Sequence, residues 1–149
     1  LDSVILRYFN VYGPGQNPAG PYSAVIAKFL DCALKHQPLP LESDGRQTRD
    51  FIFVQDIARA NLWAARQAGE GEVYNVGTGV SQSLLDLAQF IEQVCGYALQ
   101  KTFAPKRTGD IRRSLADITK LQQAGFTIQT DLLNGLKNCW QYLNNKGSL

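Results

Sequence analysis

The sequence predicts a mixed α/β fold with an incomplete sheet, and three observations lead to this prediction. Short apolar runs rich in β-branched and aromatic residues occur at 4–9 and 73–76, a pattern typical of buried strands. Longer segments carry apolar residues at three- and four-residue spacing, which predicts helices. The helices outnumber the strands, and too few strands are present to flank the two apolar ones on both sides. We therefore expect these two strands to belong to a larger sheet.

The first predicted strand runs directly into a rigid turn. Asn10 follows the apolar run 4–9, and Gly13-Pro14-Gly15 stops strand pairing because Pro lacks an N–H donor and Gly permits positive φ. Ligands of open α/β sheets bind beyond the carboxyl ends of the strands, so Asn10 is a candidate ligand contact. The alternative is that the Asn10 side chain caps its own turn.

Two helices and two short extended segments are predicted between the apolar strands. Ser23 is the expected N-cap of the first helix, and His36-Gln37-Pro38 ends it. Pro40 places the first extended segment at a sheet edge. In chain order, we expect a helix from 24 to 35, an extended segment at 39–41, a turn at 42–45, a strand at 51–54 and a helix from Asp56 to 68.

The last part of the chain is predicted to be mainly helical. Ser83 and Asp86 form a capping box at the start of one helix, and Gly96 ends it. A weak strand at 100–103 and a charged loop at 104–114 follow. Asp117 starts a short helix that stops at Gly125, and a final helix begins at 130–131.

The composition argues against several classes of function. The 149 residues suggest one domain or a piece of one, and a net charge of +2 without a dense basic run predicts no nucleic-acid partner. No apolar run approaches the roughly 18 residues that span a bilayer, and no signal peptide precedes the first strand, so we expect no membrane association and a cytoplasmic location. The dispersed Cys32, Cys95 and Cys139 fit free thiols in a reducing compartment, and a single His36 makes a metal centre unexpected.

The candidate chemistry is anion binding by loop arginines. No Ser-His-Asp set, nucleophilic Cys context or glycine-rich phosphate fingerprint occurs in the sequence. Arg49 and Arg107 both stand near glycine-containing turns, and two guanidinium groups in loops could clamp a diphosphate through paired hydrogen bonds. The alternative is that each forms a surface ion pair, Arg49 with Asp50 and Arg107 with Asp110.

A pattern that extends over nearly the whole chain gives these residues a family context. Its segments, in order, are Leu6-Arg7-Tyr8-Phe9-Asn10-Val11-Tyr12-Gly13-Pro14, Ser43-Asp44-Gly45 through Thr48-Arg49-Asp50-Phe51-Ile52-Phe53-Val54, Val73-Tyr74-Asn75-Val76-Gly77, and Gly109-Asp110-Ile111-Arg112 with Ala116-Asp117. Together they resemble the carboxyl-terminal half of the extended short-chain dehydrogenases/reductases, specifically the NAD-dependent nucleotide-sugar epimerases and dehydratases. The nearest resemblance is to UDP-glucose and UDP-N-acetylglucosamine 4-epimerases. It implies that 1–149 is the C-terminal, nucleotide-sugar-binding portion of an extended Rossmann-type fold, without its N-terminal dinucleotide-binding part.

The resemblance also implies roles for particular residues. Phe9 would lie near the nicotinamide of NAD, and Ser114 beside the C2 substituent of the sugar, where a small side chain leaves room for an N-acetyl group. The other implied contacts are Asn10 to the diphosphate or sugar, Ala24, Val25, Pro40, Leu41 and Glu42 around the base, Arg49 and Arg107 to the diphosphate, and Asp110 to the ribose. Glu42-Ser43 departs from the aromatic-Gly pair frequent in the family, which leaves the identity of the base open.

The family's catalytic Tyr-x-x-x-Lys pair and its dinucleotide fingerprint are absent from the sequence. The resemblance therefore implies a fragment that is inactive alone and belongs to an NAD-dependent UDP-sugar 4-epimerase, with a nucleotide-diphosphate sugar as partner and a homodimeric parent. A nucleotide-sugar 4,6-dehydratase and a non-catalytic nucleotide-sugar-binding module remain alternatives.

Overall fold

The computed structural model describes residues 3–19, 24–67, 69, 71–105, 109 and 111–146. Among these residues the strands outnumber the helices, so the expectation of more helices than strands is wrong; the strands are only two to four residues long, too short for several of them to give a clear sequence pattern. In chain order the elements are β1 (Ile5–Tyr8), β2 (Asn10–Tyr12), α1 (Val25–Leu34), β3 (Leu39–Glu42), β4 (Thr48–Arg49), β5 (Phe51–Phe53), α2 (Val54–Gln67), β6 (Val73–Val76), β7 (Gln82–Ser83), α3 (Leu84–Cys95), β8 (Lys101–Ala104), α4 (Thr119–Gln123) and α5 (Leu132–Lys146).

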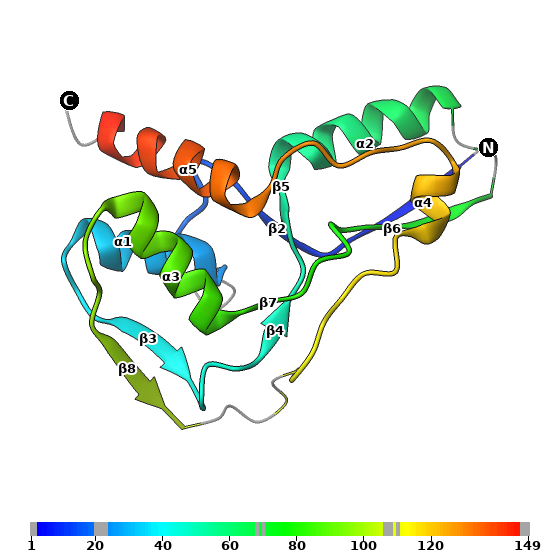
Figure 1. The fold of residues 1–149 in the computed structure, drawn as a ribbon. Helices are drawn as coiled ribbons and strands as arrows, with labels where there is room; N and C mark the ends of the chain where they lie inside the picture. Colours follow the sequence, from blue (N-terminus) through cyan, green and yellow to red (C-terminus); the bar gives the residue numbers. More distant parts are fainter. Residues whose placement is uncertain are drawn as a thin grey trace.

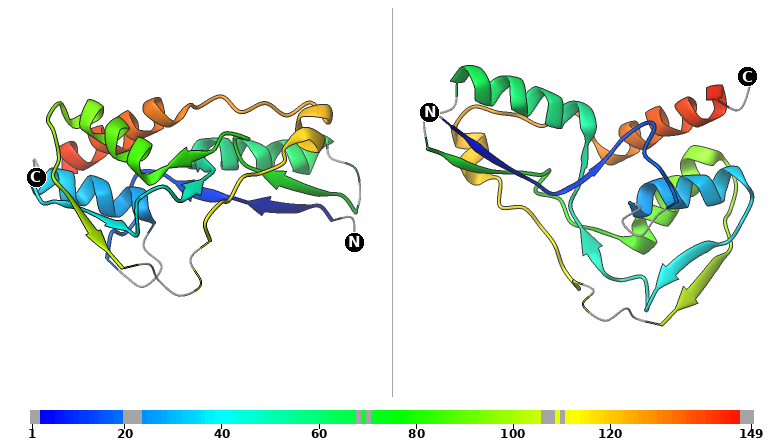
Figure 2. Two further views of the ribbon diagram at one scale, coloured as in Figure 1. Left: turned by 60° about the horizontal axis from the view of Figure 1, so that its bottom comes forward. Right: turned by 180° about the vertical axis from the view of Figure 1, so that it is seen from behind.

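The described strands form four separate pairs. β1 pairs with β6, β2 with β5 and β3 with β8, all in parallel, whereas β4 and β7 are antiparallel. The molecule is elongated: β1, β6, α2 and α4 form one end, which we call the β1–β6 end, and α1, α3, α5, β3 and β8 form the other, the helical end (Figures 1 and 2). The short pairs β2–β5 and β4–β7 lie between the two ends and connect them (Figure 1).

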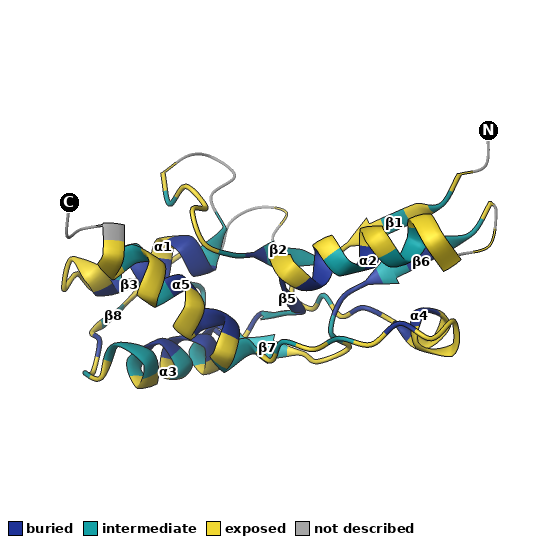
Figure 3. Cartoon of the chain, turned by 90° about the horizontal axis from the view of Figure 1, so that it is seen from above, coloured by how far each residue is buried: buried dark blue, intermediate teal, exposed yellow. Residues whose placement is uncertain are grey.

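Each end has its own hydrophobic core. At the helical end, α1, α3 and α5 pack together, and Phe29, Leu87 and Leu136 are fully buried there (Figure 3). At the β1–β6 end, Ile52, Tyr74 and Val76 pack beneath α2 and α4, with Trp63 edge-on to Tyr74. β5 contributes to both cores, because Phe51 and Phe53 belong to the first and Ile52 to the second.

The strand predicted at 4–9 is present as β1, but the expectation that Asn10 stands where strand pairing ends is wrong, because a second strand, β2, begins at Asn10. The Phe9 N–H donates to the Val76 carbonyl at 3.0 Å, whereas the next N–H, that of Asn10, donates to the Asp50 carbonyl at 3.1 Å. The chain therefore exchanges β6 for β5 as its partner between these two residues. Asn10 is the first residue of β2. It does not lie beyond the carboxyl end of the strand region, because the chain pairs again at once, now with β5.

The first strand is also less buried than its apolar sequence predicts. Ile5 is 55% exposed and Tyr8 44% exposed. Among the described residues, β1 pairs only with β6, so its second edge has no neighbouring strand. An apolar strand with one open edge is what the expectation of an incomplete sheet requires.

Local signals placed the helix ends more accurately. The Ser83 hydroxyl accepts from the Asp86 N–H at 3.0 Å and the Asp86 carboxylate accepts from the Ser83 N–H at 3.0 Å, so the capping box is confirmed. Gly96 ends the same helix with φ of 84°, as expected. α2 begins at Val54, two residues before the expected Asp56. The N-cap of α1 is Ala24, without a side-chain cap hydrogen bond, so the expectation of Ser23 at that position is wrong; Ser23 itself lies outside the described residues.

The three cysteines are free in the structure, and burial raises the pKa of the Cys139 thiol to about 11. In the part of the chain that is described, no helix combines the length and the apolar character needed to cross a membrane. The same residues hold no cluster of three His, Cys, Asp or Glu side chains suited to a metal ion.

Candidate nucleotide-sugar site

The candidate site is built around β4, the two-residue strand that carries Arg49. On one side β4 pairs with β7. On the other side the Thr48 N–H donates to the Arg112 carbonyl at 3.0 Å and the Ser114 N–H donates to the Thr48 carbonyl at 3.1 Å. These two hydrogen bonds place residues 112–114 alongside β4. Two predicted site residues that are 65 positions apart in the sequence, Arg49 and Ser114, are therefore brought together.

The Arg49 guanidinium is held at the edge of this segment. Its Nη1 donates to the Thr48 carbonyl at 2.9 Å and to the Ile111 carbonyl at 2.5 Å. Both acceptors are backbone oxygens, so these two bonds orient the guanidinium. A planar guanidinium is a side chain suited to binding a phosphate through paired hydrogen bonds.

Asn10 lies on the other side of the Arg49–Asp50 backbone. Its Nδ2 donates to the Asp50 carbonyl at 2.9 Å, the same oxygen that accepts from its own backbone N–H. The alternative in which Asn10 caps its own turn is therefore wrong, because the side chain bonds across to a segment 40 residues away. Within the described chain its Oδ1 accepts no hydrogen bond, which leaves this oxygen available to a hydroxyl or N–H of a ligand.

The alternative of an Arg49–Asp50 ion pair is also wrong. Asp50 is fully buried, and its carboxylate points away from solvent into a set of hydrogen-bond donors from 78, 79 and 116. The two side chains therefore point in different directions. The Asp50 carboxylate points into the protein interior, and the Arg49 guanidinium points toward the Ile111 carbonyl.

A second ion pair borders the site and was not singled out from the sequence. Arg112 donates to both carboxylate oxygens of Asp44, at 2.8 and 3.0 Å. The hydrogen bonds from Arg112 hold the pKa of Asp44 well below its usual value. The pair ties the 43–45 turn to the segment that contacts β4. The signal in the sequence was that both residues lie in segments of the family pattern, although their pairing could not be read from spacing.

The remaining predicted residues divide into three groups. In β3, the side chains of Leu39 and Leu41 enter the core, whereas Pro40 and Glu42 alternate to the opposite face. Leu41 is fully buried, so its proposed contact with the base has no exposed surface in this structure. Ala24 and Val25 stand at the start of α1, and Phe9 lies at the junction of β1 and β2. Arg107 and Asp110 lie outside the described residues.

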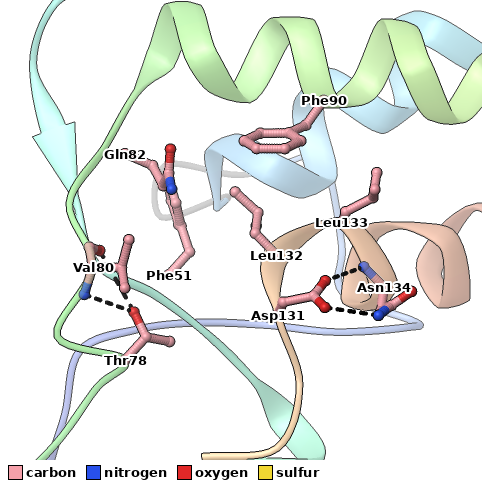
Figure 4. Close-up of a pocket in the computed structure, with 9 residues that line it drawn as sticks. All are labelled: Phe51, Thr78, Val80, Gln82, Phe90, Asp131, Leu132, Leu133 and Asn134. Atoms are coloured by element: carbon pink, nitrogen blue, oxygen red, sulfur yellow. Dashed lines mark hydrogen bonds between the residues drawn. The ribbon is translucent and has the colours of Figure 1, made fainter.

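A hollow of about 300 Å³ occurs elsewhere, between α3 and the start of α5 (Figure 4). Phe51, Phe90 and Leu132 form its apolar wall, and the Asp131 carboxylate at its rim accepts both the backbone and side-chain N–H groups of Asn134. None of the predicted site residues lines this hollow.

The arrangement of parallel strand pairs and flanking helices defines part of a Rossmann-type α/β enzyme fold, as the known structures bear out. UDP-glucose 4-epimerase of Thermotoga maritima, solved with UDP-glucose, superposes with a TM-score of 0.92 at 35% identity, covering 98% of this chain and 47% of that chain. UDP-N-acetylglucosamine 4-epimerase of Methanobrevibacter ruminantium, solved with UDP-N-acetylmuramic acid, gives a TM-score of 0.92 at 37% identity, with the same coverage.

The sequence comparisons identify the family. The model of the NAD dependent epimerase/dehydratase family matches residues 1–77, and the chain belongs to that family. UDP-glucose 4-epimerase of Mycolicibacterium smegmatis is 37% identical over 147 residues, which are 98% of this chain and 47% of that protein. The dTDP-L-rhamnose 4-epimerase of Burkholderia thailandensis is 34% identical over 134 residues, 89% of this chain and 37% of that protein. The chain spans about half the length of the UDP-glucose 4-epimerase that it matches.

Proposed function

We propose that this chain is the nucleotide-sugar-binding half of an NAD-dependent UDP-sugar 4-epimerase. The observation that carries the proposal is the pairing of β4 with 112–114, which brings Arg49 beside Ser114, with Asn10 on the adjoining backbone. Asn10 and Arg49 come from two separate segments of the family pattern, and Ser114 lies between the 109–112 and 116–117 pieces of another. Relatives that share both the fold and 35–37% identity are solved with UDP-sugar ligands.

In this proposal the chain binds and orients the substrate. Arg49 donates to the diphosphate, joined by Arg107, while Asp110 accepts from the ribose and the base lies against Pro40, Glu42 and the start of α1. A charge-assisted hydrogen bond of this kind contributes about 1.5–3 kcal/mol. Binding at the nucleotide end leaves the sugar ring free to present either face of its C4 atom to the reacting groups.

The redox and proton-transfer groups belong to the other half of the proposed parent protein. NAD supplies reversible hydride transfer when it is bound there. In this chain Phe9, half-buried at the end of β1, is the residue proposed to border the nicotinamide. β1 and β6 are proposed to be strands of the parent's Rossmann sheet. A cytoplasmic, homodimeric parent and a chain inactive by itself are parts of the same proposal.

Calorimetric titration of the chain with UDP-glucose tests the proposal. We expect Arg49→Ala to weaken binding by roughly tenfold or more, because the loss of one charge-assisted hydrogen bond corresponds to at least that factor. Arg66→Ala is the matched control, since Arg66 lies in the last turn of α2 and is not a proposed site residue; it should leave binding unchanged. Thermal melts of both variants establish that they are folded. Equal affinity for the wild type and Arg49→Ala would refute the diphosphate role.

A further inference from the structure

We propose that Asp50 is a positioning residue whose buried carboxylate fixes the spatial relation of Asn10, Arg49 and Ser114. The inference rests on the proposed function, because the three residues are those assigned to the nucleotide sugar. Asp50 itself faces away from the site and would not touch the ligand. It would act by holding in place the backbone segments that carry Asn10, Arg49 and Ser114.

The carboxylate joins two segments that are distant in the sequence. Oδ1 accepts from the Thr78 N–H at 2.8 Å and from the Thr78 hydroxyl at 2.6 Å. Oδ2 accepts from the Gly79 N–H at 2.9 Å and from the Ala116 N–H at 3.2 Å. Asp50 is fully buried, so these four bonds replace its contacts with water. The turn at 77–79 and the segment 114–116 are thereby attached to one residue.

The backbone of Asp50 completes the connection to the site. Its carbonyl accepts from the N–H and from the side-chain Nδ2 of Asn10, at 3.1 and 2.9 Å. Arg49 precedes it directly in the chain, and Ser114 lies two residues before Ala116. A displacement of Asp50 therefore moves all three proposed ligand contacts, although none of them contacts its carboxylate.

The donor set matches a side chain whose two oxygens both act as acceptors. All the groups that face it can donate, and three of them are backbone N–H groups that cannot act as acceptors. An asparagine of the same shape would direct its NH₂ group at one or two of these N–H donors. The space is closed as well, because a Cβ added to Gly77 would lie 2.7 Å from Asp50 Oδ2 and 2.5 Å from the Ala116 Cβ.

The chain contains a matched control, since Asp56 is a second fully buried carboxylate with a similar set of donors. It accepts from the backbone N–H groups of Gln129 and Thr130, at 3.0 and 3.1 Å, and pairs with Arg59. These partners anchor α2 to the segment before α5 and do not include the proposed site residues. Loss of either carboxylate removes buried hydrogen bonds, but only the loss of Asp50 disturbs the site.

The experiment compares Asp50→Asn with Asp56→Asn in the full 149-residue chain, at a temperature where melts show both variants to be folded. We expect Asp50→Asn to weaken UDP-glucose binding roughly tenfold or more and Asp56→Asn to change it less than about twofold. Amide hydrogen exchange without ligand should reveal faster exchange at Asn10 and Ser114 in the first variant, and at Gln129 and Thr130 in the second. Thr78→Val removes the hydroxyl bond to Asp50, together with the bonds of that hydroxyl to Val80, and keeps the three backbone donors; it gives a milder version of the first variant should Asp50→Asn not fold.

The outcomes separate this inference from the function on which it rests. Equal loss of binding in the two Asn variants, or unchanged exchange at Asn10 and Ser114 in both the Asp50 and Thr78 variants, would overturn the positioning role. Failure of the wild-type chain to bind UDP-glucose would instead refute the proposed function. In that case the exchange measurement would still decide whether Asp50 holds the three residues together.

Discussion

At the scale of single residues, the site depends on which side chains point outward and which point inward from the 48–50 backbone. Arg49 and Asp50 are adjacent and of opposite charge, and the sequence alone allowed an ion pair between them. The structure separates them because the buried Asp50 carboxylate accepts four hydrogen bonds from Thr78, Gly79 and Ala116. Sequence spacing could not reveal those donors, since they come from residues 28 to 66 positions away. The segments that surround Arg49 and Asp50 were therefore not predictable from the sequence.

The Asp44–Arg112 pair gives a residue-scale prediction. Because Arg112 lowers the pKa of Asp44, the carboxylate stays ionised in the folded chain at a pH where it is partly protonated in the unfolded chain. The stabilisation is therefore present above the ordinary Asp pKa of about 3.9 and is lost as pH falls through the lowered value.

Arg112→Gln removes the partner, so the pKa of Asp44 should rise toward its ordinary value. Carboxyl-carbon NMR titration of Asp44 measures this shift directly. Lys35→Gln, which removes the partner of Asp31 on α1, serves as a control that leaves Asp44 untouched. An unchanged midpoint for Asp44 in Arg112→Gln would show that the two side chains do not pair in solution.

At the scale of elements, local signals fixed the helices and long-range partners fixed the strands. The capping box at Ser83 and the glycine at 96 were predictable because each acts within a few residues of itself. The break between β1 and β2 was not predictable, because the chain changes from a partner strand 68 residues away to one 41 residues away. The pairing of β4 with 112–114 has the same origin. The candidate site residues were therefore taken from the family pattern, because the local helix and strand preferences of the sequence do not reveal which distant segments come together.

The close approach at Gly77 gives an element-scale prediction. Gly77→Ala should destabilise the chain by about 1–3 kcal/mol, as overpacking of a buried contact typically does, because the new methyl group would overlap Ala116 and Asp50. Gly69→Ala is the control: its Cβ would meet only Glu72 Cγ at 3.5 Å, an ordinary contact. Urea denaturation of the two variants measures the difference. Equal free energies of unfolding would mean that the turn at 77–79 relaxes away from Asp50.

At the scale of the whole molecule, the chain has the features of one half of a larger structure. β1 pairs in parallel with β6, and the Ile5 and Phe9 N–H groups donate to the Glu72 and Val76 carbonyls, so the backbone groups of the alternate residues Leu6 and Tyr8 point to the other edge. The chain also spans 47% of the length of its epimerase relatives of known structure. The proposed place of β1 and β6 within a parent Rossmann sheet accounts for both observations. The expectation of an incomplete sheet was therefore the most informative inference from the residues themselves.

The most direct test of the central claim is an NMR titration of the ¹⁵N-labelled chain with UDP-glucose. If Arg49, Asn10 and Ser114 form one nucleotide-sugar site, their amide signals should shift together with a single dissociation constant. The signals of Phe90, Leu133 and Asn134, which line the separate hollow, should stay in place. Shifts confined to that hollow, or unrelated responses of the three site residues, would contradict the account.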